Sequence, residues 1–452
     1  MCIVCQTISM GAAALTGILP MATPEHYESP TATPSAAVSA PLTATAPAAI
    51  VPSIAGTTCK KVGTVRTTTA GRFTCTSSKN TKVWRLTKSS STSVDTTTTT
   101  TTTTTTIPRG YLKPTCGAGI ADCPTESPGG NLNECRLTDA TPGSGSQGFP
   151  RSPKAKPGKA VVNVLVLPVR YANRQISEAQ VRAQYEPEFE KTRDFFKRNS
   201  YGRITPNFTI ESESQWVNIP DTWQTFVNSR DQDLRRVIPD VIKLIPRQNL
   251  RDFDSIFIVE AGGNVYWGGA DLDATYTHAS GDVHSVYFQT GLASNAYFPH
   301  NIGHTAYYFE DLYIHPYFRT RETVDINPLK YEVMASGDDF TMWNRWLAGF
   351  VTDTEVRCVS AGTGQSVHRL VHANNAAGQK LVMVPTSTGQ ALFAEYINNG
   401  VHVYELNSNI SHGAGPMKTL GLLGSGQSVT HAGVTFQVSA TDSSGVYITV
   451  TR

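Results

Sequence analysis

The chain has 452 residues, so we expect roughly two or three folded units, because ordinary domains cluster around 100–200 residues. Only 16% of the residues are charged and the formal net charge is +2, which excludes the basic footprint of a nucleic-acid-binding protein. No stretch after residue 22 holds the ~20 consecutive apolar residues of a membrane-spanning helix, which excludes a helical anchor there.

The N-terminus predicts export to a secreted or cell-surface location. Residues 1–22 contain a short apolar stretch of small residues, and Ala22 could precede a cleavage site, as in a possible signal peptide. The positive charge that usually begins such a segment is missing, so an ordinary buried helix is the alternative. Residues 23–56 are mostly Ala, Pro, Thr and Ser with almost no large apolar side chain, which predicts a disordered linker.

Residues 57–87 differ in texture, with short alternating apolar runs separated by turn residues. We expect a small β-hairpin module closed by a Cys59–Cys75 disulfide. It resembles short cysteine modules of exported actinobacterial proteins over about thirty residues. Residues 88–108 contain an unbroken threonine run from Thr96 to Thr106, which has no amphipathic face and predicts an extended Ser/Thr-rich linker. A spacer of this kind would suit association with a cell wall.

The segment 109–158 is irregular, with little core of its own, and carries Cys116, Cys123 and Cys135. Such a composition favours disulfides formed in an oxidising compartment. We expect these cysteines to tie the segment onto the domain that follows, with Cys358 as one candidate partner. The connectivity stays open at this point.

Residues 159–352 predict a mixed sheet with helices packed on it. The run at 161–169 is apolar throughout, so it predicts a strand buried on both faces, and 283–289 alternates like an edge strand. Ser177 is a good N-cap for a helix at 177–199. Further strands are expected at 204–210 and 253–260, with a helix at 234–244. Residues 353–452 alternate in short segments and predict an all-β, sandwich-like domain.

The segment that carries chemistry begins at Pro299. His300 and His304 are four residues apart, so on a helix both imidazoles project from one face and can share a metal ion. In the zinc-peptidase motif His-Glu-x-x-His, the glutamate after the first histidine takes a proton from metal-activated water, and here Asn301 occupies that position. Two stacked surface histidines are the alternative interpretation.

A third ligand would be Glu310 or Asp311, which follow His304 by six and seven residues. A straight helix would carry Asp311 about 10 Å beyond His304, too far to share one ion. The helix must therefore break near residues 307–309. Glycine is the usual residue for such a break, but Tyr307 and Tyr308 stand here.

The segment Tyr-Glu-Val-Met-Ala-Ser-Gly at 331–337 is similar to the methionine turn of metzincins, with Met334 under the metal; a core methionine is the alternative. Together with Asn-Ser-Tyr-Gly at 199–202, His-x-x-Gly-His, Asp-Leu-Tyr and Trp…Leu-Ala-Gly-Phe, the order resembles immune-inhibitor-A-like zinc metallopeptidases over roughly 160–352. The resemblance implies a zincin-like α+β fold, a zinc cofactor held by His300, His304 and either Glu310 or Asp311, and a protein or peptide substrate.

Asn301 departs from that family on the chemistry itself. An amide can orient water but cannot carry its proton, and general acid–base catalysis is worth ~10²–10⁴-fold in rate. Three hypotheses follow: a metallopeptidase-like protein with impaired catalysis, an active secreted zinc endopeptidase, or a structural or adhesive wall protein. His278, His284 and His315 are weaker candidates near the site, and we expect the first two to be solvated.

Overall fold

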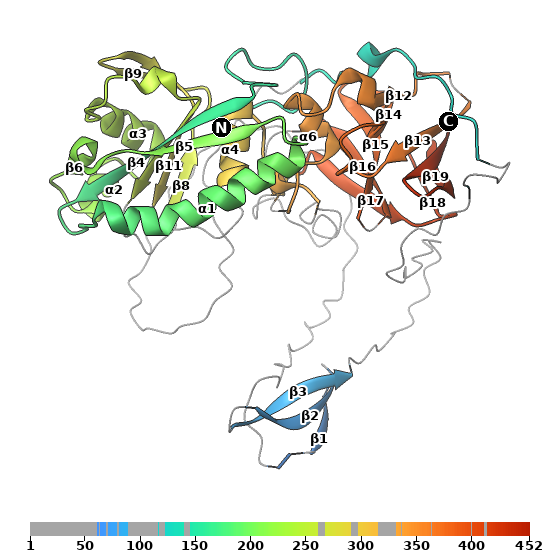
Figure 1. Cartoon of the computed structure of the whole chain (residues 1–452), viewed down its shortest axis with the longest axis horizontal. Coiled ribbons are helices and arrows are strands. Elements are labelled where there is room, and N and C mark those ends of the chain that lie inside the picture. The colour runs from blue at the N-terminus through green and yellow to red at the C-terminus, as the bar shows by residue number, and fades with distance from the viewer. Residues whose placement is uncertain are drawn as a thin grey trace, which may run out of the picture. The chain divides into compact units, whose positions relative to one another are not determined.

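A computed structural model describes residues 61–62, 64–68, 71–78, 81–88, 116, 123–139, 145–260, 267–290, 297–314, 331–335, 337–362, 364–398, 400–410 and 414–452 (Figure 1). The possible signal peptide at 1–22, the linker at 23–56 and nearly all of the linker at 88–108 lie outside these residues. The chain forms two compact units, one holding the small β module and the other holding everything from residue 107 onward.

The small module is a three-stranded antiparallel sheet and not the expected hairpin. Strand β2 (Gly71–Ser78) lies between β1 (Val65–Thr68) and β3 (Thr81–Lys88). Cys75 on the central strand is buried and disulfide-bonded, while Cys59, its expected partner, lies outside the described residues.

A six-stranded sheet organises the α/β part. Its order is β5-β4-β7-β11-β8, with β6 also paired to β4. All pairings are parallel except that of β11 with the edge strand β8. The bounds are β4 (Val161–Tyr171), β5 (Thr205–Ile210), β6 (Val217–Ile219), β7 (Ser255–Glu260), β8 (Trp267–Ala270) and β11 (Val286–Thr290).

The expectation of an edge strand at 283–289 is wrong. Strand β11 lies inside the sheet between β7 and β8, and its side chains from Val286 to Gln289 are all buried. Gln289, one of the polar residues that suggested alternation, is only 3% exposed and therefore does not face solvent. Strands β9 (Tyr276–His278) and β10 (Gly281–Val283) instead form a separate antiparallel pair.

Helices cover both faces of the sheet, because alternate residues of β4 point to opposite sides. Val164 and Val166 join the core beneath α1 (Glu178–Asn199) and α4 (Tyr297–Tyr307), whereas Leu165 and Leu167 join the core beneath α2 (Trp223–Asn228) and α3 (Leu234–Lys243). The predicted N-cap Ser177 accepts a hydrogen bond from the Gln180 backbone and completes a capping box.

The short 3-10 turns are η1 (Leu132–Cys135), η2 (Glu213–Gln215), η3 (Leu250–Asp252), η5 (Val333–Ala335) and η6 (Asp353–Glu355).

The C-terminal part is β-rich, as predicted, with two sheets whose facing side chains share one core. The first sheet runs β12 (Val356–Cys358), β14 (Leu381–Ser387), β15 (Gln390–Ile397), β16 (Gly400–Asn407), β17 (Met417–Leu423). The second runs β13 (Gln365–Val371), β20 (Gly445–Thr451), β19 (Val434–Thr441), β18 (Ser428–His431). Strands β12, β17 and β18 were not predicted.

The α/β and β-rich parts pack directly against each other. Helix α6 (Met342–Leu347) supplies Trp343, whose ring lies 5.3 Å from that of Phe393 on β15. The buried Glu395 carboxylate accepts a hydrogen bond of 2.6 Å from the Met342 backbone at the start of that helix. The two parts are therefore in close contact near the boundary at residue 353.

One disulfide fastens the preceding irregular segment to this body, while the expected tie through Cys116 and Cys123 is wrong because these two cysteines bond to each other. Cys135 on η1 is bonded to Cys358 on β12, and Cys116 is bonded to Cys123. The candidate role of Cys358 is thereby confirmed.

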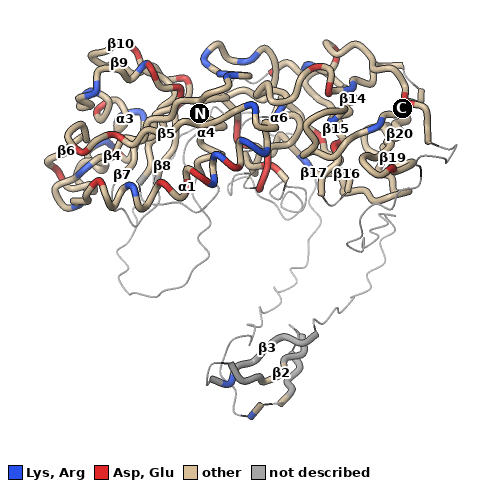
Figure 2. Tube along the Cα trace, viewed as in Figure 1, with Lys and Arg blue, Asp and Glu red and all other residues tan. Residues whose placement is uncertain are grey.

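Acidic and basic residues are interspersed along the trace (Figure 2). Within the described residues, no helix combines the length and apolarity that crossing a membrane requires.

Candidate metal centre

Three side chains converge at the end of α4. His304 Nε2 lies 3.0 Å from His300 Nε2 and 3.1 Å from Asp311 Oδ1, and His300 Nε2 lies 3.2 Å from the same oxygen. All three residues are buried. Within the described part of the chain they are the one His/Cys/Asp/Glu group spaced to hold a metal ion.

Backbone carbonyls orient both imidazoles. His300 Nδ1 donates to the Val333 carbonyl at 2.9 Å, and His304 Nδ1 donates to the Phe309 carbonyl at 2.7 Å. A proton fixed on each Nδ1 leaves the two Nε2 lone pairs directed at each other and at Asp311. With neutral imidazoles three acceptors would face one another, so the group requires a shared cation, either a metal ion or a proton added to an imidazole.

The electrostatics of Asp311 agree with such a cation. Burial alone would raise the pKa of its carboxyl, but positive charge at His304 and hydrogen bonds from both imidazoles hold that pKa well below its usual range. A proton on one imidazole can bridge only two of the three atoms. His300, His304 and Asp311 could together hold a zinc ion, which takes nitrogen and oxygen ligands of these types.

The helix breaks where a third ligand requires it, without glycine. Helix α4 ends at Tyr307, and Tyr308 adopts a left-handed φ of 56°. The Tyr308 and Phe309 amides donate back to the carbonyls of His304 and Gly303, each at 3.0 Å. This turn brings Asp311 beside His304, which a continued helix would prevent.

Glu310 and Asp311, the alternatives for the third ligand, lie in different surroundings. Asp311 joins the histidines, whereas Glu310 Oε1 accepts a hydrogen bond of 2.9 Å from the Gly145 backbone. Glu310 therefore holds the preceding segment against the turn.

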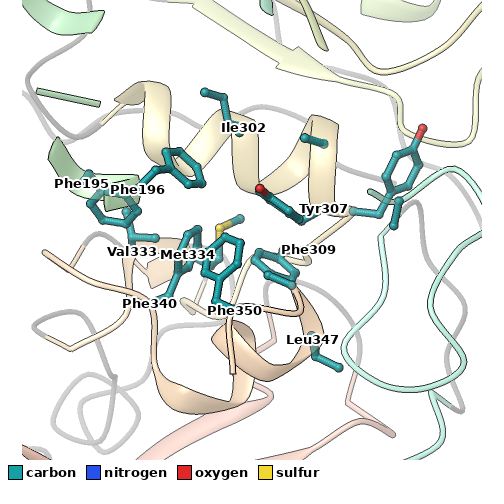
Figure 3. Packing of buried hydrophobic residues seen from close by; sticks show 14 of the residues in the cluster. Phe195, Phe196, Ile302, Tyr307, Phe309, Val333, Met334, Phe340, Leu347 and Phe350 are labelled. Atoms are coloured by element: carbon teal, nitrogen blue, oxygen red, sulfur yellow. The ribbon is translucent and has the colours of Figure 1, made fainter. Parts of the chain in front are cut away.

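The turn at 331–337 lies beneath α4, and Met334 is fully buried in it. Figure 3 shows Met334 among aromatic side chains that include Phe309, Phe340 and Phe350. A Cβ at Gly303 would lie 2.7 Å from Met334 Sδ, so the absence of a side chain at Gly303 allows this approach. The Met334 carbonyl in turn accepts the Leu312 amide at 3.0 Å.

Glu332 anchors the same turn and was not singled out from the sequence. Its carboxylate accepts hydrogen bonds from the Met334 amide at 3.0 Å and from the Thr341 amide and hydroxyl at 2.8 and 2.6 Å. Burial raises the pKa of Glu332 to about 7, and these hydrogen bonds limit the rise. Nothing in the sequence indicated that Glu332 would be buried and not exposed to solvent.

Asn301, the residue after His300, is 1% exposed. Within the described residues, neither its Oδ1 nor its Nδ2 has a hydrogen-bond partner. Buried amides are normally paired, so the lack of a partner here is unusual.

His278 and His284 lie apart from this group. His278 is buried and bonds to Ser280 and to the Ile245 carbonyl, so the expectation of a solvated side chain is wrong there. The Nδ1 atom of His284 lies 3.2 Å from the Thr275 hydroxyl. His315 lies outside the described residues.

No protein-family model matches this sequence, and no curated protein matches it either. The two nitrogen donors and one carboxylate oxygen, with outer hydrogen bonds that fix the imidazoles, fit a zinc ion.

Proposed function

We propose that the chain is a zinc-binding, metallopeptidase-like protein of the immune-inhibitor-A type whose hydrolytic activity is impaired. In this proposal the α/β part is zincin-like, the β-rich part is a sandwich, and a protein or peptide binds beside the metal. The observation that supports it most strongly is the convergence of His300, His304 and Asp311 within 3.0–3.2 Å.

Bound zinc would polarise a peptide carbonyl as a Lewis acid. His300, His304 and Asp311 would hold the ion, and the carbonyls of Val333 and Phe309 keep the imidazoles aligned. Asn301 can donate one hydrogen bond and accept another, but it cannot take up a proton near neutral pH. Ligand binding is therefore retained while proton transfer is lost.

Two other functions are distinguished by experiment. An active secreted zinc endopeptidase would need a base other than Asn301. A structural or adhesive wall protein would need no metal, and that function gives no reason for three potential ligand atoms to converge in the interior. Disulfides Cys116–Cys123 and Cys135–Cys358 support the proposed secreted or cell-surface location, since disulfides persist in oxidising compartments.

The test compares zinc content and casein cleavage for wild type, Asn301→Glu and Asn301→Gln. We expect about one zinc per chain in all three and no cleavage above background in the wild type. Asn301→Glu should gain chelator-sensitive cleavage because it restores a titratable group. Asn301→Gln is the matched control, because it has the length of glutamate without its proton chemistry, and it should stay inactive.

Wild-type cleavage abolished by a chelator would instead establish the active endopeptidase. Absence of zinc from the wild type would favour the structural or adhesive wall protein.

A further inference from the structure

The ligand turn depends on a strained residue. Tyr308 occupies the left-handed region, which is unfavourable for residues that carry a Cβ. Its ring is buried and its hydroxyl lies 3.0 Å from the Ser285 hydroxyl. The surrounding structure must impose this conformation, because no glycine relieves it.

Residues 145–158, here called the strap, run along the end of α4. The Ser146 amide donates to the Tyr308 carbonyl at 2.7 Å, and the Lys156 amide donates to the Ala306 carbonyl at 2.9 Å. A Cβ at Gly145 would lie 2.9 Å from the Phe309 carbonyl oxygen, so glycine permits the close approach. The strap thus pairs backbone groups that the helix end leaves open.

Arg151 is the side chain that completes this contact. Its Nη2 donates to the carbonyls of Tyr307 and Tyr308, and its Nη1 donates to the strap carbonyls of Ser146 and Gly148 at 2.9 and 3.1 Å. Burial lowers the pKa of Arg151 to about 10, with Asp139 and Glu310 opposing the change, so the guanidinium stays charged at neutral pH. A cation at a helix C-terminus is favourable.

The carbonyls held by Arg151 lead directly into the ligands. Phe309 follows Tyr308, and its carbonyl fixes the His304 imidazole at 2.7 Å. Asp311 lies two residues further on, and Arg151 also faces the ring of Phe309 at 5.4 Å. Movement of the Tyr307–Tyr308 carbonyls would therefore displace two ligands together.

We propose that Arg151 is a positioning residue of the metal centre, which holds the left-handed turn at Tyr308 and thereby places His304 and Asp311. The strap performs the task that glycine performs in an ordinary break. This inference rests on the proposed zinc site, so its test includes one measurement that requires no zinc.

The experiment titrates zinc into the full chain carrying Arg151→Lys or Arg151→Met. Lysine keeps the charge but cannot fork between two pairs of carbonyls. We expect zinc affinity to fall about 10–100-fold for both variants, the usual effect of losing a group that orients metal ligands.

Arg230→Lys is the matched control. Arg230 is half-buried, donates to the Phe226 carbonyl at 2.9 Å near the end of α2, and lies 3.7 Å from the Phe226 ring centre. It belongs to the opposite face of the sheet. Its replacement should leave zinc affinity unchanged.

Amide hydrogen exchange of the Phe309 and Leu312 N–H groups is measured on the zinc-free chain. Faster exchange in Arg151→Lys, with the Ile302 amide of α4 unchanged, is expected and supports the positioning role even if zinc fails to bind. If zinc binds but neither affinity nor exchange differs from wild type, the inference is overturned and the proposed function stands. If zinc fails to bind and exchange is unchanged, both are overturned.

Discussion

The ligand group and the turn beneath it are both buried and polar, yet they are stabilised in opposite ways. At Glu332 a carboxylate meets three donors from Met334 and Thr341. At His300, His304 and Asp311, three potential ligand atoms meet one another and require a shared cation. The chain itself completes the turn, whereas a metal ion or an added imidazole proton completes the ligand group. A group that an added cation must complete indicates binding more strongly than one that the chain itself satisfies.

The substitution Asp311→Asn tests this contrast directly, and we expect it to have the largest effect of the proposed variants. The amide removes one zinc ligand, so zinc affinity should fall about 100-fold or more. Asparagine also removes the negative charge that the imidazoles stabilise, so the zinc-free protein should lose about 1–3 kcal/mol in unfolding free energy. Zinc titration and urea unfolding with and without chelator measure the two effects.

Glu310→Gln serves as the control for Asp311→Asn. Glutamine keeps an oxygen that can accept from the Gly145 amide, and Glu310 lies outside the ligand group. Zinc affinity should therefore stay within a few-fold of wild type. A large loss at residue 310 with none at residue 311 would reverse the assignment of the third ligand.

The elements of the core were predictable because apolar periodicity survives in them. Strand β4 and helix α1 appear where the apolar run and Ser177 indicated. Strand β11 was misassigned because Gln289 is buried without being apolar. Periodicity records which residues are apolar and cannot distinguish a buried polar residue from a solvated one.

The site shows a similar division. The pairing of His300 with His304 followed from helical spacing alone, but the choice between Glu310 and Asp311 depended on backbone geometry. That geometry is imposed on Tyr308 by the strap, more than 150 positions away in the sequence. A local pattern cannot encode such a contact, and Arg151 was missed for this reason. Glu332 was missed although its partners are near in sequence, because no pattern distinguishes a buried acid from a solvated one.

A second test addresses the turn through Glu332→Gln. The two oxygens of Glu332 serve different donors, and an amide offers only one oxygen, so one backbone N–H loses its partner at a cost of about 1–3 kcal/mol. This loss should appear in urea unfolding near pH 5. Zinc affinity should change less than in Asp311→Asn.

The difference in unfolding free energy between wild type and Glu332→Gln should shrink as pH rises. The pKa of Glu332 is about 7 in the folded chain against an ordinary value of 4.5, so the folded state keeps a proton that the unfolded state releases between these values. The stabilisation is present below pH 4.5 and is lost as pH rises through 7, by about 3 kcal/mol. The variant lacks this loss, so its deficit against wild type should close between pH 5 and 8. A constant deficit would contradict the raised pKa.

The smallest effect is expected for Gly303→Ala, which tests how tightly the two regions join. Alanine gains about 1 kcal/mol in helix propensity, but its Cβ would crowd Met334 Sδ, and overpacking costs about 1–3 kcal/mol. The net loss of unfolding free energy should be near 1 kcal/mol. In a Met334→Ala background the crowding disappears, so Gly303→Ala should become stabilising by about 1 kcal/mol. If the sign of the effect is the same in both backgrounds, the methionine does not set the spacing between the turn and α4.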